Sequence, residues 1–343
     1  MSTATVERPT ESAASRLFAL LRAREIGIAF LIVIVVIATS INNHHFADKA
    51  SLQQLLSGAA LIALLGVGET LVIVTRNVDL SVGSVLGLSA YIVGDLFKFH
   101  HIPVWSGFAI GILVGAVCGA INGFIVTVMR VPSLVVTLGM LYIIRGVDGV
   151  IVNGDRIDPN FIPTGFTAVG YRNFFGIPWL AIIVAVVVAA VGYGMRSYRP
   201  SRDLYAIGSN PDAAALAGTP IGRRVFTAFF VSGALAGLAG ALFLALHTQI
   251  DNSGGQGYEL TVVAAVVVGG VAIFGGSGTV VGAALGALLL NTINQALVAS
   301  RISAFWNQAV AGALLLAAIG FDRWLTLRNT KKLKSAEGAH REL

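Results

Sequence analysis

The amino-acid sequence predicts an all-α fold, a polytopic membrane helical bundle with about ten transmembrane helices. Hydrophobic residues make up 56% of the 343 residues, and charged residues only 12%. A soluble domain carries about 25% charged residues, so this chain has too few charges to cover a globule of its size. Its 40 glycines follow no triplet period and it has one cysteine, which excludes a collagen-like chain and a disulfide-stapled module.

Ten apolar stretches approach the length that the hydrocarbon core of a bilayer requires, about 20 residues each. The first is short, and the apolar run 259–299 can be divided differently, so nine spans is the competing count. No clear cleavage site follows the first stretch, and we expect an uncleaved anchor. The expected spans are residues 25–41, 55–74, 80–97, 104–128, 132–152, 178–195, 224–246, 259–274, 279–299 and 303–321.

The basic residues are distributed unevenly between the loops of this ten-span arrangement. With the N-terminus in the cytoplasm, 17 of the 23 Lys and Arg residues fall in cytoplasmic segments or, for Arg224, at the cytoplasmic start of a span, 5 fall in outer segments, and Arg145 lies within a span. Loops rich in Lys and Arg stay in the cytoplasm, so the sequence predicts that both termini are cytoplasmic. This topology explains the net charge of +6 without a nucleic-acid partner.

The expected organisation is one transmembrane domain, residues 25–322, between a cytoplasmic N-terminal segment, 1–24, and a basic cytoplasmic tail, 323–343. Two of its loops are longer than a tight turn. The outer loop 153–177 contains two prolines and several polar residues, and we expect it to form a small cap outside the membrane. The other long loop, 196–223, is expected in the cytoplasm.

Glycines recur every three or four residues in several expected spans, which aligns them on one face of a helix. Because lipid provides no hydrophobic driving force for helix association, close approach through small residues is how such helices pack. The pattern therefore predicts a tightly packed bundle and indicates nothing about the substrate. The stripes are Gly107, Gly111, Gly115, Gly119 and Gly123, then Gly233, Gly237 and Gly240, then Gly278, Gly282 and Gly286.

Charged residues inside the expected spans are informative, because burying a charge at mid-span costs roughly 2.5–3.5 kcal/mol on insertion scales. Asp95 is one of them. Arg145 and Asp148 are three residues apart on one helix and can pair, either as a structural ion pair or as the polar lining of a pathway. Glu69 can pair with Arg76, two turns further on, or with a neighbouring helix, and it either packs or lines a pathway.

Asn291, Asn294 and Gln295 share one face of the expected span 279–299, at helical spacing. Carboxamides both donate and accept hydrogen bonds, which suits a neutral, sugar-like polyol. The alternative is that these amides link neighbouring helices to one another. Together with the charged groups in the spans they form the set of translocation-path candidates, namely Glu69, Arg145, Asp148, Asn291, Asn294 and Gln295.

Two short segments lie on the expected cytoplasmic side. Residues 75–84 form a tight turn in which Asp79 or Ser81 can cap the following helix. In the loop 196–223, Asn210 is a suitable N-cap and Gly218 can end a helix in the left-handed conformation. A helix of about seven residues is too short to be stable alone, so it either docks on another protein or is a solvated connector.

Three motifs resemble the ribose-type permeases of bacterial ABC sugar importers, in the same order along the chain. The resemblance covers residues 50–322, and within this family residues 75–77 and 304–307 are most similar to permeases of autoinducer-2 and rhamnose importers. The motifs are Asn77-Val78-Asp79-Leu80-Ser81-Val82-Gly83-Ser84, then Ala206-Ile207-Gly208-Ser209-Asn210-Pro211-Asp212-Ala213-Ala214 with Gly218, then Gly269-Gly270 with Phe274-Gly275-Gly276-Ser277-Gly278-Thr279.

The resemblance implies a type II ABC importer permease, with a fold like that of vitamin B12 importers, in the bacterial cytoplasmic (inner) membrane. Its substrate is expected to be a sugar or sugar-like molecule of the rhamnose, pentose or autoinducer-2 class. Expected partners are an ABC ATPase subunit, a periplasmic or lipid-anchored sugar-binding protein, and a second permease copy or a paralogous permease. The resemblance assigns coupling to the ATPase to Gly208, Asn210, Ala213, Ala214 and Gly218, and a signature turn to Asn77, Asp79, Ser81 and Gly83.

The sequence contains no Gly-Lys pair and therefore no Walker A loop. We expect no cofactor, no metal and no catalytic residue in this chain, with ATP–Mg bound by the partner ATPase.

Other classes of protein stay open as alternatives. An ion-coupled secondary transporter would use Glu69, Arg145 and Asp148 as a proton or cation relay. A branched-chain amino-acid ABC permease would share the fold and differ in substrate. A membrane-embedded enzyme lacks support, since the sequence has no HExxH motif and places no histidine–carboxylate cluster within a span.

Overall fold

The computed structural model describes residues 24–303, 306 and 308–320. Within these residues the chain is almost entirely helical, and the described sheet is one antiparallel hairpin of two-residue strands, β1 (Asn173–Phe174) and β2 (Ile177–Pro178). The expected tail 323–343, and all of the segment 1–24 except Arg24, lie outside the described residues.

Among the described residues, eight helices are long and apolar enough to cross a membrane by length and composition. They are α2 (Arg24–Asn42), α3 (Lys49–Ile73), α4 (Val82–His100), α5 (Val104–Thr127), α6 (Ser133–Val152), α8 (Trp179–Ser197), α11 (Ile221–His247) and α13 (Val280–Ala299). Shorter elements join them. These are η1 (His44–Ala47), η2 (Pro159–Phe161), α7 (Thr164–Tyr171), α9 (Arg199–Ser209), α10 (Pro211–Leu216), α12 (Tyr258–Val268) and an apolar helix at Gln308–Gly320.

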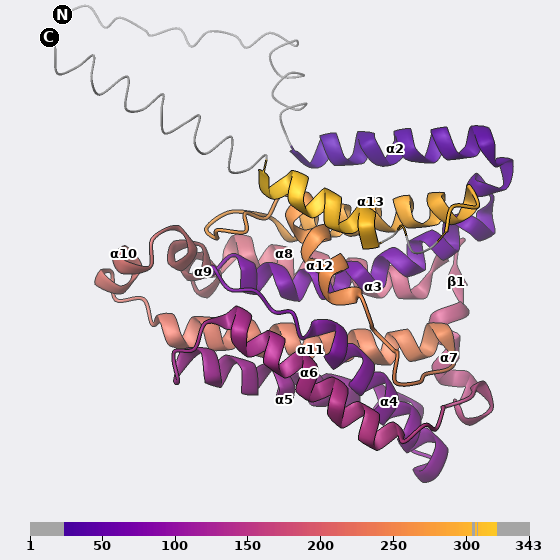
Figure 1. The fold of residues 1–343 in the computed structure, drawn as a ribbon, viewed down its shortest axis with the longest axis horizontal. Helices are drawn as coiled ribbons and strands as arrows, with labels where there is room; N and C mark the ends of the chain where they lie inside the picture. The colour runs from indigo at the N-terminus through magenta and orange to yellow at the C-terminus, as the bar shows by residue number, and fades with distance from the viewer. Residues whose placement is uncertain (1–23, 304–305, 307, 321–343) are drawn as a thin grey trace, which may run out of the picture.

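Helix α3 is the centre of the bundle. Apolar residues lie on every side of this helix, which is typical of a helix surrounded by protein. Of its most apolar stretch of 18 residues, 89% is buried. Helices α8, α11 and α13 pack around it, α2 lies outside α13, and α4 and α5 lie beyond α11 (Figure 1). The apolar surfaces of α2 and α8 are largely exposed within this chain.

The two ends of the bundle carry different connections (Figure 1). One end carries α9 and α10, together with the loops 74–81 and 269–279, which contact α9. We call it the α9 end. The opposite end carries η1, α7 and the β1–β2 hairpin, and we call it the hairpin end.

The structure confirms the predicted helical membrane bundle and corrects one of the expected spans. The span expected at 259–274 is too long, because α12 ends at Val268 and a loop begins. Gly270, Gly275, Gly276 and Gly278 in this loop have positive φ angles, which glycine adopts without the steric cost of a Cβ. The 11 residues of α12 rise about 16 Å, roughly half the hydrocarbon core. The span expected at 303–321 is described only in part.

The predicted glycine stripes form the closest helix crossings. A Cβ at Gly115 of α5 would clash with the Gly233 carbonyl of α11, and a Cβ at Gly237 of α11 would clash with the Gly111 carbonyl of α5. The crossing is therefore backbone against backbone, as expected where small residues drive helix association in lipid. A further close contact of this kind joins Gly282 of α13 to the backbone of the chain just after α12.

We predict that Gly115→Leu lowers the thermal stability of the purified chain strongly, whereas Gly139→Leu does not. Overpacking a well-packed contact typically costs 1–3 kcal/mol, and the Gly115 site offers only backbone atoms to displace. Gly139 is the matched control, because it lies within a spanning helix and a Cβ added there would meet no atom within 4 Å. Thermal unfolding in detergent measures the effect, and equal melting temperatures for the two variants would contradict it.

Candidate functional site

Helices α9 and α10 form a pair beyond the ends of the spanning helices (Figure 1). The break between them is at Asn210, whose side-chain oxygen accepts a hydrogen bond from Ala213 N at 3.1 Å, so Asn210 is the N-cap that the sequence predicts. Gly218 follows α10 with φ +78°, which confirms the left-handed ending. Ala214 is buried, Ala213 is exposed, and Leu216 is 92% exposed, so α10 presents part of its surface outward.

The last turn of α9 lies directly on two loops from other parts of the chain. A Cβ at Gly208 would clash with the Val74 carbonyl and the Gly276 N–H, so a side chain is excluded there. Gly276 N donates to the Val74 carbonyl at 2.9 Å, and the Tyr205 hydroxyl donates to the Gly278 carbonyl at 2.9 Å. We call this contact the α9 seat, formed by residues 74–76, 205–209 and 275–278.

Arg76 fastens the α9 seat. Its Nε donates to the Gly208 carbonyl at 2.5 Å and its Nη2 to the Ser209 carbonyl at 2.7 Å. The last carbonyls of a helix have no partner within the helix, and a cation beside them is favourable because of the helix dipole. The suggested pairing of Arg76 with Glu69 is therefore wrong, since Arg76 binds α9 instead.

Glu69 is fully buried and joins a polar network at the turn between α3 and α4. Its Oε1 accepts a hydrogen bond from Asp79 N at 3.0 Å, while its Oε2 has no hydrogen-bond partner among the described residues. Asp79 accepts from Ser81 N and Oγ at 3.0 and 2.6 Å, and Asn122 of α5 donates to Ser81 Oγ at 2.9 Å. Burial raises the pKa of Asp79 and outweighs the Ser81 hydrogen bonds, which lower it. The network ties α3, α4 and α5 together.

The other two residues of the signature turn also stabilise the fold locally. The Asn77 side chain donates to the carbonyl and the hydroxyl of Thr75 at 3.1 and 2.9 Å. A Cβ at Gly83 would clash with the Glu259 carboxylate and the Gly255 carbonyl, so glycine lets α4 approach the start of α12.

Arg145 and Asp148 do not form the ion pair that their spacing suggests. Arg145 Nη1 donates to the Gly254 carbonyl at 2.5 Å, because the loop before α12 passes beside α6. Asp148 is buried, and neither of its carboxylate oxygens has a hydrogen-bond partner among the described residues. Arg145 lines a cavity of about 530 Å³ together with Glu259 of α12 and Gln308.

Asn291, Asn294 and Gln295 of α13 line a different cavity, of about 540 Å³, toward the hairpin end. Two amides around it are held by hydrogen bonds. Asn291 donates to the Leu55 carbonyl at 2.8 Å, and Gln53 donates to the Gly176 carbonyl at 2.9 Å. The described lining includes no Asp, Glu, Lys or Arg. We call this the amide cavity, lined by Gln53, Gln54, Ser57, Gly58, Gly170, Tyr171, Asn173, Pro178, Leu246, His247, Tyr258, Asn291, Asn294 and Gln295.

The structure separates the translocation-path candidates: Glu69 lies in the buried turn, Arg145 lines one cavity, and Asn291, Asn294 and Gln295 line the amide cavity, while Asp148 is buried and lines neither cavity. Sequence reasoning missed Gln53, Gln54 and Asn173. The two glutamines precede the expected span 55–74 and Asn173 lies in the expected outer loop 153–177, so the sequence marks none of them as a polar residue within a span. Only the tertiary structure brings them to the same cavity as the amides of α13.

The α9 seat and the amide cavity share two helices. Helix α3 contributes Gln53 and Gln54 to the cavity, and the chain just after it enters the seat at Val74. Helix α13 begins after the 275–278 loop of the seat and reaches the cavity at Asn291. Twenty residues of helix span about 30 Å, so the two sites lie at opposite ends of the same helices.

The architecture is that expected of a membrane permease: helices long enough to cross a membrane, a polar cavity toward one end and a helix pair seated outside the spans at the other. The chain belongs to the family described as the permease component of the branched-chain amino acid transport system, which matches residues 51–319. It is thus a permease subunit of an ABC importer, and the resemblance to that class of permeases is confirmed.

The chain is similar over nearly its whole length to proteins named autoinducer 2 import system permease protein LsrC. The protein from Klebsiella pneumoniae is 35% identical over 319 residues, 92% of each chain. The protein from Photorhabdus luminescens is 35% identical over 302 residues, 87% of this chain and 89% of the relative. The protein from an Enterobacter species is 34% identical over 320 residues, 92% of each chain. No solved structure matches this chain.

We predict that Gly208→Ala unseats the end of α9, because its Cβ meets the Val74 carbonyl and the Gly276 N–H. Hydrogen–deuterium exchange of residues 199–216 should then become faster by at least tenfold, with the spanning helices unchanged. Gly222→Ala is the matched control, since the nearest atom to its Cβ is 3.9 Å away. Unchanged protection of α9 in the Gly208 variant would show that the seat does not hold this helix.

Proposed function

We propose that this permease imports an uncharged, hydroxyl-rich molecule of the sugar or autoinducer-2 class, driven by ATP hydrolysis on a separate ATPase subunit. The amide cavity is the observation that carries the proposal. The names of the relatives, which describe autoinducer 2 import, support the same substrate class.

The lining of the amide cavity suits a neutral polyol. Each carboxamide both donates and accepts hydrogen bonds, and so does each hydroxyl of a sugar. The adjacent residues Asn294 and Gln295 of α13 line the cavity together with Gln53 and Gln54 of α3, so hydroxyls on different sides of a ligand find partners. These amides replace the water molecules that hydrate the ligand, and because the ligand is neutral, no charge is buried without a partner.

The family description makes a branched-chain amino acid the second candidate substrate. An amino acid carries a carboxylate and an ammonium group, and a charge removed from water needs an opposite charge or several hydrogen bonds. The described lining of the amide cavity supplies amides and hydroxyls, together with His247, and no Arg, Lys, Asp or Glu. This composition favours the neutral polyol over the zwitterion.

The coupling role is assigned to α10 and the α9 seat, through Gly208, Asn210, Ala213, Ala214 and Gly218. The exposed part of α10, with Leu216, is the proposed contact with the ATPase. Because α9 rests on the end of α3 and on the loop before α13, a displacement of α9 transmits force to the two helices that also wall the amide cavity. This is a rigid-element coupling between two ends of the bundle.

The remaining assignments follow from this function. The α9 end faces the cytoplasm, both termini are cytoplasmic, and the membrane is the bacterial inner membrane. ATP–Mg binds to the ATPase, a substrate-binding protein docks at the hairpin end, and a second copy of this chain or a paralogous permease completes the pore.

We predict that Asn294→Leu raises the KM for substrate uptake about tenfold, the effect of losing one or two neutral hydrogen bonds. Val298→Leu is the matched control, because Val298 lies one turn further along α13, is exposed and does not line the cavity. The assay follows uptake of labelled ribose, rhamnose, autoinducer-2 and leucine by the chain assembled with its ATPase and binding protein. Preferential uptake of leucine, or uptake by the chain alone under an ion gradient, would contradict the proposal.

The topology makes a separate prediction. Thr164→Cys at the hairpin end and Ala215→Cys on α10 should react with a membrane-impermeant thiol reagent from opposite sides of the membrane, since both positions are exposed. The chain without an added cysteine is the control, because the native Cys118 is buried. Labelling of both positions from the same side would contradict the proposed orientation.

A further inference from the structure

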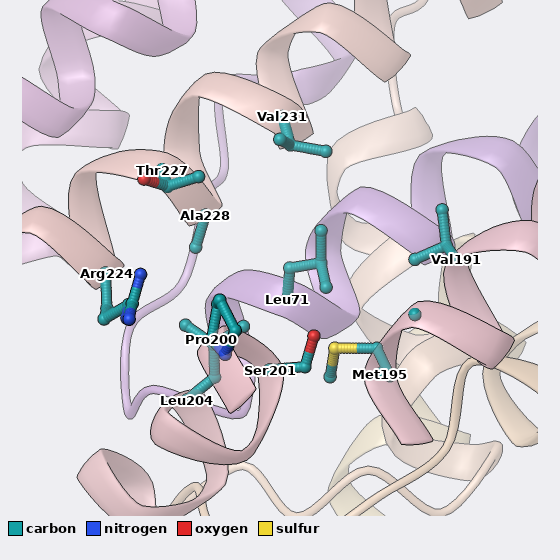
Figure 2. A pocket seen from close by; sticks show the side chains of 11 residues that line it. Leu71, Val191, Met195, Pro200, Ser201, Leu204, Arg224, Thr227, Ala228 and Val231 are labelled. Atoms are coloured by element: carbon teal, nitrogen blue, oxygen red, sulfur yellow. The ribbon is translucent and has the colours of Figure 1, made fainter. Parts of the chain in front are cut away.

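We propose that a groove between α8, α9 and α11 binds an anionic phospholipid, with an acyl chain in the groove and the phosphate at the arginines of the α9 end (Figure 2). This site is separate from the amide cavity and does not depend on which molecule the permease transports.

The groove has a volume of about 210 Å³ and apolar walls. Leu71 of α3 forms the floor, and Figure 2 shows it between Met195 of α8 on one side and Val231 of α11 on the other. Leu204 of α9 lies across the end of the groove. A narrow slot of this kind fits a hydrocarbon chain better than a bulky polar ligand, whose groups would find few partners there.

The groove is accessible from the lipid phase rather than from a protein interior. Its two long walls belong to spanning helices, and other apolar side chains of the same helices are exposed, including Val186 of α8 and Phe230 of α11. Acyl chains surround these helices in a bilayer, so a chain in the groove gains no hydrophobic free energy over one outside it. Any preference for one lipid must therefore come from its headgroup.

The headgroup preference comes from Arg224, which lines the groove, and from the exposed arginines of the segment 196–224. Arg224 lines the groove and is about three-quarters buried, and its Nε pairs with Asp203 at 2.7 Å. A guanidinium has five N–H donors. Because the Arg224 Nε pairs with Asp203, the N–H groups on the other two nitrogens can bind a phosphate. Four more arginines are direct sequence neighbours of residues that line the groove, and all four are exposed. The segment 196–224 contains only two acidic residues, Asp203 and Asp212. The four exposed arginines are Arg196, Arg199, Arg202 and Arg223.

This arrangement matches the requirements of an anionic phospholipid. Basic residues between helices at a membrane surface attract acidic headgroups, each by about 1 kcal/mol, and guanidinium groups bind phosphate oxygens in pairs. Because α9 forms one wall of the groove, a bound lipid also bridges α9 to α8 and α11. The lipid thereby stabilises α9 on its seat.

The test is native mass spectrometry of the full purified chain with added phosphatidylglycerol or phosphatidylcholine of identical acyl chains. We expect phosphatidylglycerol to bind at least tenfold more tightly, and Arg224→Gln to weaken its binding about fivefold while weakening phosphatidylcholine less, because choline offsets the charge of the phosphate in that lipid. Glycerol phosphate, which has the anionic group and no acyl chain, should not compete. Equal binding of the two lipids, or full competition by glycerol phosphate, would overturn the proposal.

Two groove-filling variants separate this site from other lipid contacts. Ala228→Trp places an indole over Leu71 and should abolish selective binding of phosphatidylglycerol. Val231→Phe should also fill the groove and abolish this selective binding. Because Val231 is only half-buried, the larger side chain disturbs folding less than one at the buried Ala228. Val186→Trp, on an exposed position of α8 away from the groove, is the control. If the folded Val231 variant binds phosphatidylglycerol as the parent chain does, the lipid does not occupy this groove.

Discussion

Backbone-to-backbone contact at glycines is the constraint on which the rest of this structure depends. In lipid, helices gain nothing from hiding apolar side chains, so they associate where backbones approach closely. Gly115 and Gly237 provide this approach where α5 crosses α11, and Gly208 provides it where α9 meets the loops at the ends of α3 and α12. A methyl group at any of these positions would hold the elements apart and change the paths of the helices around α3.

The same constraint supports the proposed mechanical coupling between two distant sites. The α9 seat has no flexible side chain between Gly208, Val74 and Gly276, and Arg76 fixes it with two further hydrogen bonds. Close-packed contacts of this kind shift between discrete arrangements rather than deform continuously. The proposed coupling follows these contacts: a movement of α9 would be passed to α3 and to the loop before α13, and both α3 and α13 wall the amide cavity at their far ends.

Much of this architecture could be predicted from the sequence, because it depends on local rules. Apolar length located the spans, the glycine periods identified faces of α5 and α11 that pack closely, and Asn210 and Gly218 located the boundaries of α10. The half-length of α12 was not predicted, since hydropathy does not distinguish a half-helix followed by a glycine loop from a full span.

Contacts between residues far apart in the chain could not be predicted from the sequence. Arg145 is three residues from Asp148, yet it binds the Gly254 carbonyl of a loop more than one hundred residues away. Arg76 is seven residues from Glu69, yet it binds the end of α9. The amide cavity likewise combines glutamines of α3 with amides of α13. In each case tertiary packing offered a better partner than the local spacing suggested.

The most direct test of the proposed coupling measures whether the α9 end and the cavity move together. Spin labels at Val117 of α5 and Ala215 of α10 report the position of the coupling helix, and labels at Val117 and Val298 report the cavity end of α13. All three positions are exposed. We predict that ATP binding to the assembled transporter changes both distances, and that Gly208→Ala removes the change at Val298 only. A shift of α10 that leaves the α13 distance unchanged in the unmutated chain would contradict the coupling.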